Sequence, residues 1–219
     1  MPVKRRLARG EITYSEAKEE EVNVLHQLTF WNQRVKFYTY VNNRRDLIKA
    51  LVVHHLGLRS PSACHVAEIR EWMQGSFNLC IPVTVEKSKR VLVRFPLPYR
   101  TGDKIHPGNS DEKVRCEAGS YAWLQQECPT VPIPHLYGFG LSTGQRFTAL
   151  KHRSISTRLL QYFRRQILSL LGYPLPSCFL QHHAALSDEL GAYLLMDHIE
   201  KTEGEALSET WTEQYNNEN

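Results

Sequence analysis

Apolar residues recur with two different periods along this chain. Between residues 14 and 57 they follow helical spacing, as at Leu47 and Leu51, and neither Pro nor Gly interrupts the segment before Gly57. Between residues 64 and 98 apolar and polar residues alternate instead, which is typical of β-strands. We therefore expect an N-terminal helical extension that ends at Gly57, followed by a region rich in strands.

The alternating region divides into three candidate strands. We expect the first over residues 65–73, a turn over residues 75–78, and strands near residues 79–86 and 91–95. Short connections make the three strands antiparallel neighbours. Pro82 cannot donate a backbone hydrogen bond, so its position indicates an edge strand or a bulge.

A long helix follows over residues 110–127. Ser110 is suited to the N-cap, and acidic residues in the first turn favour a helix start there. Three prolines after Glu127 end the helix and predict an extended connector: Pro129, Pro132 and Pro134.

Further apolar segments predict a strand over residues 146–150, an amphipathic helix over residues 156–171 and a last strand over residues 192–196. Arg158 and Arg165 lie opposite the apolar side of that helix, so we expect them on a basic face in solvent. The predicted class is α+β: an antiparallel sheet of about five strands, one long helix between the third and fourth strands, and an inserted helix.

Composition narrows the class of protein. The chain has 219 residues, 42% of them hydrophobic and 23% charged, as in ordinary globular proteins. A net charge of +4 is too weak to indicate nucleic-acid binding. The five cysteines include no CxxC pair, which favours reduced thiols and argues against a zinc site.

No apolar run is long enough to span a membrane, so we expect no membrane partner and a cytoplasmic protein. The N-terminus is a basic tip that we expect to be disordered. Mitochondrial targeting is the weaker alternative, because the acidic residues from Glu11 to Glu21 follow the basic tip at once. Two adjacent histidine pairs, His54-His55 and His182-His183, cannot share a helix face, so we expect no metal site there.

Three features occur in the order that phosphate binding requires. The turn Gly75-Ser76-Phe77-Asn78 can bring backbone N–H groups close to phosphate oxygens. Arg94 stands within an apolar strand, where a cation needs a partner. Glu117 lies on the long helix, at the margin of its apolar stripe, and an ion pair with Arg94 would fix the cation. The plainer alternatives are an ordinary turn, an exposed arginine and a solvated glutamate.

The end of the last strand is the fourth feature. Met196, Asp197, His198 and Ile199 mark an abrupt change from apolar to polar residues. The plain interpretation is the end of a buried strand.

Together these features resemble the fungal branch of the aminoglycoside phosphotransferase and choline-kinase-like family. Four segments carry the resemblance: GSFNLCIPVTV, RVLVRFPLP, EKVRCEAGSYAWLQQECPTVPIPHLYGFG and LGAYLLMDHIEKTEGEALSETW. The resemblance implies the N-lobe of a bilobal kinase-like fold, which binds ATP with Mg²⁺ and transfers phosphate to a small-molecule hydroxyl. It covers about residues 60–211.

The resemblance also implies roles for single residues. The turn from Gly75 to Asn78 matches the nucleotide loop, Arg94 matches the phosphate-binding cation, Glu117 matches the helix glutamate, and Met196 to Ile199 match the hinge that binds adenine. The family usually has Lys where this chain has Arg94, and the two cations are not interchangeable.

The catalytic motif of the family, HxDxxxxN, does not occur in this sequence. None of the five aspartates is followed by Asn five positions later: Asp46, Asp103, Asp111, Asp188 and Asp197. Because metal ligands and a positioned Asp carry this chemistry, we expect no catalytic or metal-binding residues and no activity of the chain alone. The sequence then reads as an N-lobe that is truncated after the hinge, without the C-lobe.

We accordingly expect three regions: 1–60 as the basic tip and helical extension, 61–211 as the kinase-like N-lobe, and 212–219 as a disordered tail. The expected partner is a nucleotide. The alternatives are a non-catalytic protein-interaction module, whose partner would cover the exposed hinge face, and a truncated pseudokinase. Nucleic acid is the least favoured partner.

Overall fold

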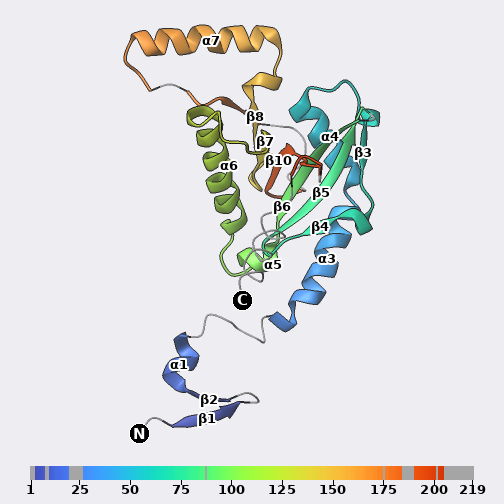
Figure 1. Cartoon of the computed structure of the whole chain (residues 1–219), viewed down its shortest axis with the longest axis vertical. Helices are drawn as coiled ribbons and strands as arrows, with labels where there is room; N and C mark the ends of the chain where they lie inside the picture. The colour runs from blue at the N-terminus through green and yellow to red at the C-terminus, as the bar shows by residue number, and fades with distance from the viewer. Residues whose placement is uncertain are drawn as a thin grey trace. The chain divides into compact units, whose positions relative to one another are not determined.

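The computed structural model forms two compact units, Met1–Thr39 and Tyr40–Asn219 (Figure 1). The structure describes residues 3–7, 10–19, 27–86, 88–174, 176–183, 190–200 and 202–204. The tail expected over residues 212–219 lies outside this range. The fold is α+β, as predicted, with a mostly antiparallel sheet and several helices.

The first unit begins with a hairpin. Strands β1 (Lys4–Leu7) and β2 (Gly10–Thr13) pair antiparallel, and helix α1 (Tyr14–Glu19) follows. The prediction of a disordered basic tip is therefore wrong for this segment. One acidic residue of the second strand meets a basic residue of the first, since Lys4 Nζ lies 3.8 Å from Glu11 Oε2. Thr13 and Glu16 form reciprocal side-chain to backbone hydrogen bonds, which fix the start of α1.

Two longer helices follow, in part as predicted. Helix α3 (Phe30–Asn42) continues into the second unit, and helix α4 (Arg45–Leu56) lies wholly within it. Gly57 ends α4 with a φ of 65°, so the predicted C-cap is confirmed. Because α4 contacts β3 of the sheet, it lies in the same compact unit as the sheet, upstream of the boundary expected at residue 60.

The second unit is built on one sheet, whose described strand pairs are all antiparallel. Its order is β3-β5-β6-β10-β7-β8-β9, and β4 pairs with β5 beside β3. The strands are β3 (Cys64–Val66), β4 (Met73–Gln74), β5 (Asn78–Val85), β6 (Lys89–Pro96), β7 (Leu136–Gly140), β8 (Gln145–Ala149), β9 (Phe179–His183) and β10 (Tyr193–Asp197).

The strand predicted over residues 65–73 is two short strands. The 3-10 helix η2 (Ile69–Glu71) separates β3 from β4, and a reciprocal capping box between Glu68 and Glu71 stabilises it. Pro82 lies opposite this gap, within an interior strand rather than at an edge. A proline fits there because neither β3 nor β4 pairs with that position.

Strands β7 and β9 were not predicted. Residues before Gly140 were expected to form an extended connector, but β7 pairs with β10 on one side and with β8 on the other. Two glycines in β7 hide the alternating pattern, because each one makes room for a side chain. A Cβ on Gly138 would lie 2.3 Å from His55 Nδ1, and a Cβ on Gly140 would lie 2.3 Å from Tyr193 Cε1.

The long helix α6 (Asn109–Glu127) follows the short helix α5 (Pro98–Thr101). Gly108, not Ser110, occupies its N-cap. Ser110 lies one residue inside the helix, where its backbone N–H donates to Asp103 Oδ1 at 2.9 Å. The predicted N-cap is therefore wrong: Ser110 does not cap the helix, and the carboxylate of Asp103 in the preceding loop accepts from one of the free N–H groups of the first turn.

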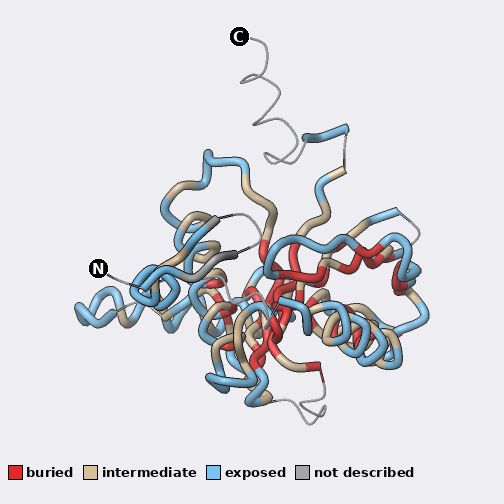
Figure 2. Tube along the Cα trace, turned by 90° about the horizontal axis from the view of Figure 1, so that it is seen from below, coloured by how far each residue is buried: buried red, intermediate tan, exposed pale blue. Residues whose placement is uncertain are grey.

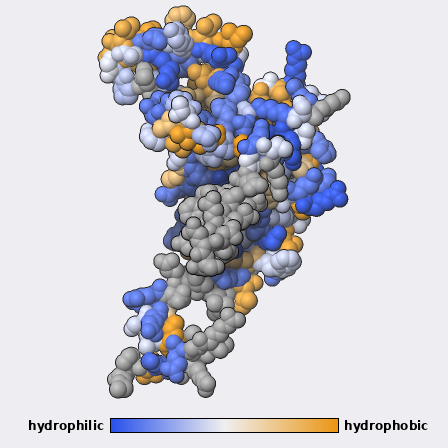
Figure 3. Space-filling model, viewed as in Figure 1, coloured by the Kyte–Doolittle hydropathy of each residue, from blue (hydrophilic) through white to orange (hydrophobic). Residues whose placement is uncertain are grey.

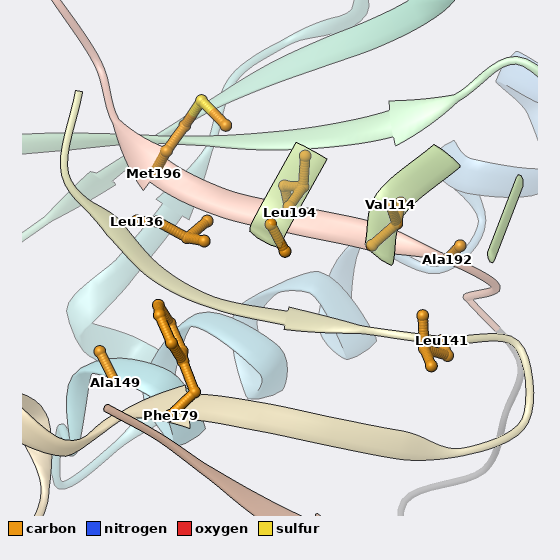
Figure 4. Packing of buried hydrophobic residues seen from close by; sticks show 9 residues of the cluster. Val114, Leu136, Leu141, Ala149, Phe179, Ala192, Leu194 and Met196 are labelled. Atoms are coloured by element: carbon orange, nitrogen blue, oxygen red, sulfur yellow. The ribbon is translucent and has the colours of Figure 1, made fainter. Parts of the chain in front are cut away.

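Helices cover both faces of the sheet around its central strand, β10. Residues 193 to 196 are all buried (Figure 2), which is typical of a strand covered on both faces. Leu194 and Met196 pack with Val114 of α6 in a cluster that also includes Leu136 (Figure 4). Tyr193, on the opposite face, contacts His55 of α4.

The insertion between β8 and β9 holds the 3-10 helix η3 (Leu150–His152) and the helix α7 (Ile155–Leu170). A further 3-10 turn, η1 (Pro61–Ala63), leads into β3. Among the described helices, none combines the length and the apolar character needed to cross a membrane.

Candidate functional site

Arg94 lies on β6, on the face of the sheet that α6 covers. Its cross-strand neighbours are Cys80 on β5 and Leu194 on β10. The structure brings Arg94 and Glu117 together, with Arg94 Nη1 3.6 Å from Glu117 Oε2. Both side chains are about three-quarters buried, since 26% and 22% of their surfaces are exposed. The partner expected for the strand cation is thus present.

Asn78 is a second support for Arg94. The side-chain amide of Asn78 is buried, and its orientation follows from the hydrogen-bond network. With the oxygen toward the guanidinium, it accepts from Arg94 Nε at 3.0 Å and from Nη2 at 2.6 Å, and the amide nitrogen donates to the Phe77 carbonyl at 3.2 Å. Asn78 therefore fixes the plane of the guanidinium.

Lys113 is a second cation in this cluster, which the sequence analysis missed. It stands one helical turn before Glu117 and forms an ion pair with Glu117 Oε1. Among the described residues, the ion pairs of Arg94 and Lys113 both end on Glu117. Two cations share one carboxylate, so the cluster carries one positive charge more than it has negative charge. The spacing of four residues could have revealed Lys113 in the sequence.

Two further groups line the cluster. Burial raises the pKa of the Cys80 thiol, while the charge of Arg94 lowers it and that of Glu117 raises it. Burial likewise raises the pKa of Tyr121, whose hydroxyl lies 3.9 Å from the sulfur of Met196. Cys80 cannot be found from sequence periodicity alone, because the cross-strand register brings it to Arg94.

The predicted nucleotide turn lies between β4 and β5, near the cluster. It is closed by the Gly75 N–H, which donates to the Asn78 carbonyl at 2.9 Å. Phe77 is 52% exposed, and its ring centroid lies 6.0 Å from Lys113 Nζ. A Cβ on Gly75 would meet only the Asn78 carbonyl oxygen, at 4.0 Å, so packing within the chain does not demand glycine there. Ser76 is exposed on the same turn.

The predicted hinge begins at the end of β10. Asp197 is held by β7 and by the residue before it. Its backbone N–H donates to the His135 carbonyl at 2.9 Å, and its side chain accepts from the His135 N–H and from the Tyr137 hydroxyl. A cavity of about 690 Å³ lies beside this segment, and its lining includes Asp197, His198 and Ile199. Lys89 and Arg90 at the start of β6 also line it.

Met196 is the cross-strand partner of Leu92, which stands two residues from Arg94 on β6. Two residues of a strand span roughly 7 Å. The structure therefore places the Arg94 cluster and the end of β10 at neighbouring positions of one sheet.

A separate polar network is buried on the opposite face. His55 is fully buried; its Nδ1 lies 2.8 Å from Thr148 Oγ1, and its Nε2 lies 2.9 Å from the Tyr193 hydroxyl. Burial holds the pKa of His55 well below its usual value. Burial, with nearby cations, lowers the pKa of His54 to about 4, and its ring centroid lies 5.5 Å from that of His182.

His182 comes close to the adjacent pair His54-His55, although it lies far from them in the sequence. Arg146 and Arg153 contribute to lowering the pKa of both His54 and His55, so this environment disfavours a cation. Across the part of the chain that the structure describes, no group of three or more His, Cys, Asp or Glu side chains could hold a metal ion. Within this network, His55 is an imidazole that is hydrogen-bonded at both ring nitrogens.

The charged cluster of Arg94, Lys113 and Glu117 is the candidate site. Its donor chemistry fits an anion, since it combines an excess cation with partial burial. Comparison with known proteins gives no further assignment: no family model, no curated protein and no solved structure matches this chain.

Proposed function

We propose that the second unit binds the phosphates of a nucleotide, with ATP as the first ligand to test, and that Arg94 contacts those phosphates. The observation that supports this proposal is the charge of the cluster. Arg94 and Lys113 share the single carboxylate of Glu117, so a bound phosphate would balance the remaining positive charge.

The donors of Arg94 also suit a phosphate. A guanidinium has five N–H groups. Asn78 accepts one from Nε and one from Nη2, and the Glu117 oxygen lies at 3.6 Å from Nη1, beyond ordinary hydrogen-bond length. Within the described residues, donors on both terminal nitrogens thus stay available. Two parallel N–H groups match two phosphate oxygens.

The adenine end of the ligand would lie toward the end of β10. The apolar residues Leu92 and Met196 lie between Arg94 and Asp197 on the sheet, and Asp197 lines the 690 Å³ cavity. An apolar surface that ends in polar groups is typical of small-molecule sites. We therefore propose that Met196 to Ile199 contact the adenine, and that the turn from Gly75 to Phe77 covers the phosphates.

The resemblance to an aminoglycoside-phosphotransferase-type N-lobe supports the same proposal. Phosphoryl transfer needs metal ligands and a positioned acidic residue besides a phosphate cradle. The donors of Arg94 suit the phosphates of ATP, and the described residues include no group of three or more His, Cys, Asp or Glu side chains that could hold a metal ion. We accordingly limit the proposal to nucleotide binding, with transfer dependent on residues other than these.

The proposal is tested by thermal unfolding with ATP, ADP, AMP and adenosine, each with Mg²⁺. A ligand at 100 times its dissociation constant stabilises the folded state by about 2.7 kcal/mol. For a unit of this size that raises the Tm by roughly 5–11 °C. We expect the shift to grow with the number of phosphates and to be absent with adenosine. No shift at millimolar ATP, or an equal shift with adenosine, would contradict the proposal.

A further inference from the structure

Helix α7 is amphipathic, and its polar side, not its apolar side, is the half-buried one. Its half-buried residues recur on one side, at Thr157, Gln161, Arg165 and Leu168. Arg165 Nη1 donates to the Pro176 carbonyl at 2.9 Å, which holds this side against the following segment. The half-buried side of α7 is therefore largely polar.

The apolar side of α7 faces solvent. Its residues follow helical spacing and are strongly exposed: Leu160 67%, Phe163 60%, Ile167 57%, Leu170 86% and Leu171 64%. We call these five residues the α7 stripe. Figure 3 shows hydrophobic residues gathered over α7, at the top of the view. The expectation of a basic face in solvent is wrong for Arg165, because the apolar side is the more exposed one.

Charge shows what kind of surface would cover the α7 stripe. The chain has 23 acidic residues, yet none occurs from residue 128 to residue 187. Six cations lie in the same segment: Arg146, Lys151, Arg153, Arg158, Arg164 and Arg165. Exposed Ile155, Leu159 and Tyr162 widen the apolar side of α7 beyond the α7 stripe. At 100° per residue, Arg164 projects beside the stripe, and Arg158 projects from the far margin of this wider side. An apolar side between arginines, on a helix without acidic residues, matches an anionic surface with an apolar interior.

We propose that α7 lies in the interface of an anionic membrane, with the α7 stripe among the acyl chains and Arg158 and Arg164 at the headgroups. A helix with a large apolar face, a basic polar face and low overall hydrophobicity has the properties of an interfacial helix. Arginine stems extend along apolar surface while their charged ends stay in the headgroup layer.

Charge argues against a second copy of the chain as the occupant, because two such helices would bring arginines together without any carboxylate between them. The proposal also revises the expectation of no membrane partner, which considered only spans. It is independent of nucleotide binding, since α7 and the Arg94 cluster share no residue.

The test is flotation of the whole protein with vesicles of phosphatidylcholine alone or mixed with phosphatidylserine. The wild-type chain should float with the anionic vesicles, less so at high salt, and poorly with the neutral ones. Replacing two stripe residues (Leu160→Ser with Ile167→Ser) should weaken binding about 100-fold. The matched control is Ile105→Ser, another exposed aliphatic residue, which should leave binding unchanged.

The arginines are tested by Arg158→Gln with Arg164→Gln, which should weaken binding to anionic vesicles about 30-fold. Its control is Lys104→Gln with Arg115→Gln, two exposed cations elsewhere. All these side chains are exposed, so unchanged circular dichroism should accompany each variant.

Three results would overturn the proposal. One is a wild-type chain that stays unbound with anionic vesicles, and another is a stripe variant that binds like the wild type. The third is a wild-type dimer in light scattering that the stripe variant converts to a monomer, because that result assigns the stripe to a second copy.

Discussion

Replacing His55 by Gln should remove a defined part of the pH dependence of stability. His55 is fully buried among Thr148 and Tyr193, with a lowered pKa, so the folded state resists its protonation while the unfolded state does not. Below a pH of about 6.5 the unfolded chain therefore binds one more proton at this position, and stability falls as pH falls. The slope is about 1.4 kcal/mol per pH unit for one histidine.

Between pH 7 and pH 5 this slope amounts to about 2 kcal/mol. For a unit of this size that is a decrease in Tm of roughly 4–8 °C. Glutamine cannot titrate, so His55→Gln should show a Tm that falls by that much less over the same pH range. Its Tm at pH 7 should also be lower, because the amide cannot reproduce both hydrogen bonds, each worth about 1 kcal/mol.

The groups that face His55 do not obscure this difference. His54, His182, Arg146 and Arg153 surround it electrostatically and remain in both proteins. The assay is thermal unfolding followed by circular dichroism at half-unit pH steps. His65→Gln, at an exposed position of β3, is the control and should keep the wild-type slope. A His55→Gln variant with the wild-type slope would refute the reasoning.

Two smaller predictions concern packing and thiols. Gly140→Ala should lower the free energy of unfolding by about 1–3 kcal/mol, because the new Cβ would lie 2.3 Å from a Tyr193 ring that His55 holds. Gly119→Ala, on α6 with nothing within 4 Å, should instead raise it by up to about 1 kcal/mol in the same denaturant titration; equal effects would contradict the packing account. In mass spectrometry after iodoacetamide, exposed Cys116 should be alkylated well before Cys80, whose pKa burial raises; the reverse order would contradict the burial of Cys80.

Much of the sheet could be predicted because period-two alternation marks strands with one covered face. The interior strands β5 and β6 were predicted from such alternation, and the central β10 was predicted from a short apolar run. Strand β7 could not be predicted, because it has glycine at positions 138 and 140, where the side chains of His55 and Tyr193 fill the space that a Cβ would need. This requirement for glycine comes from tertiary packing, and the local sequence pattern does not show it.

The candidate site was likewise predictable in part: some of its residues follow from the sequence, and others depend on tertiary packing. Arg94 could be predicted as a site residue because it is a charge within an apolar strand, and Glu117 because it lies on the long helix at the margin of its apolar stripe. Asn78 was expected to face a ligand, yet the register of β5 and β6 makes it a support for Arg94. On α7 the apolar residues were evident from the sequence, but the side that faces the protein was not.

The central claim is that Arg94 binds phosphate, and isothermal titration of ATP into an Arg94→Met variant tests it most directly. Methionine keeps much of the length of the side chain, and Lys113 remains to neutralise Glu117, so the fold should persist. Losing charge-assisted hydrogen bonds worth about 1.5–3 kcal/mol predicts a dissociation constant roughly 10 to 150 times that of the wild type. Arg115→Met, an exposed arginine on the same helix as Glu117, should bind as the wild type does. Equal ATP affinity in the Arg94→Met variant and the wild type would contradict the account.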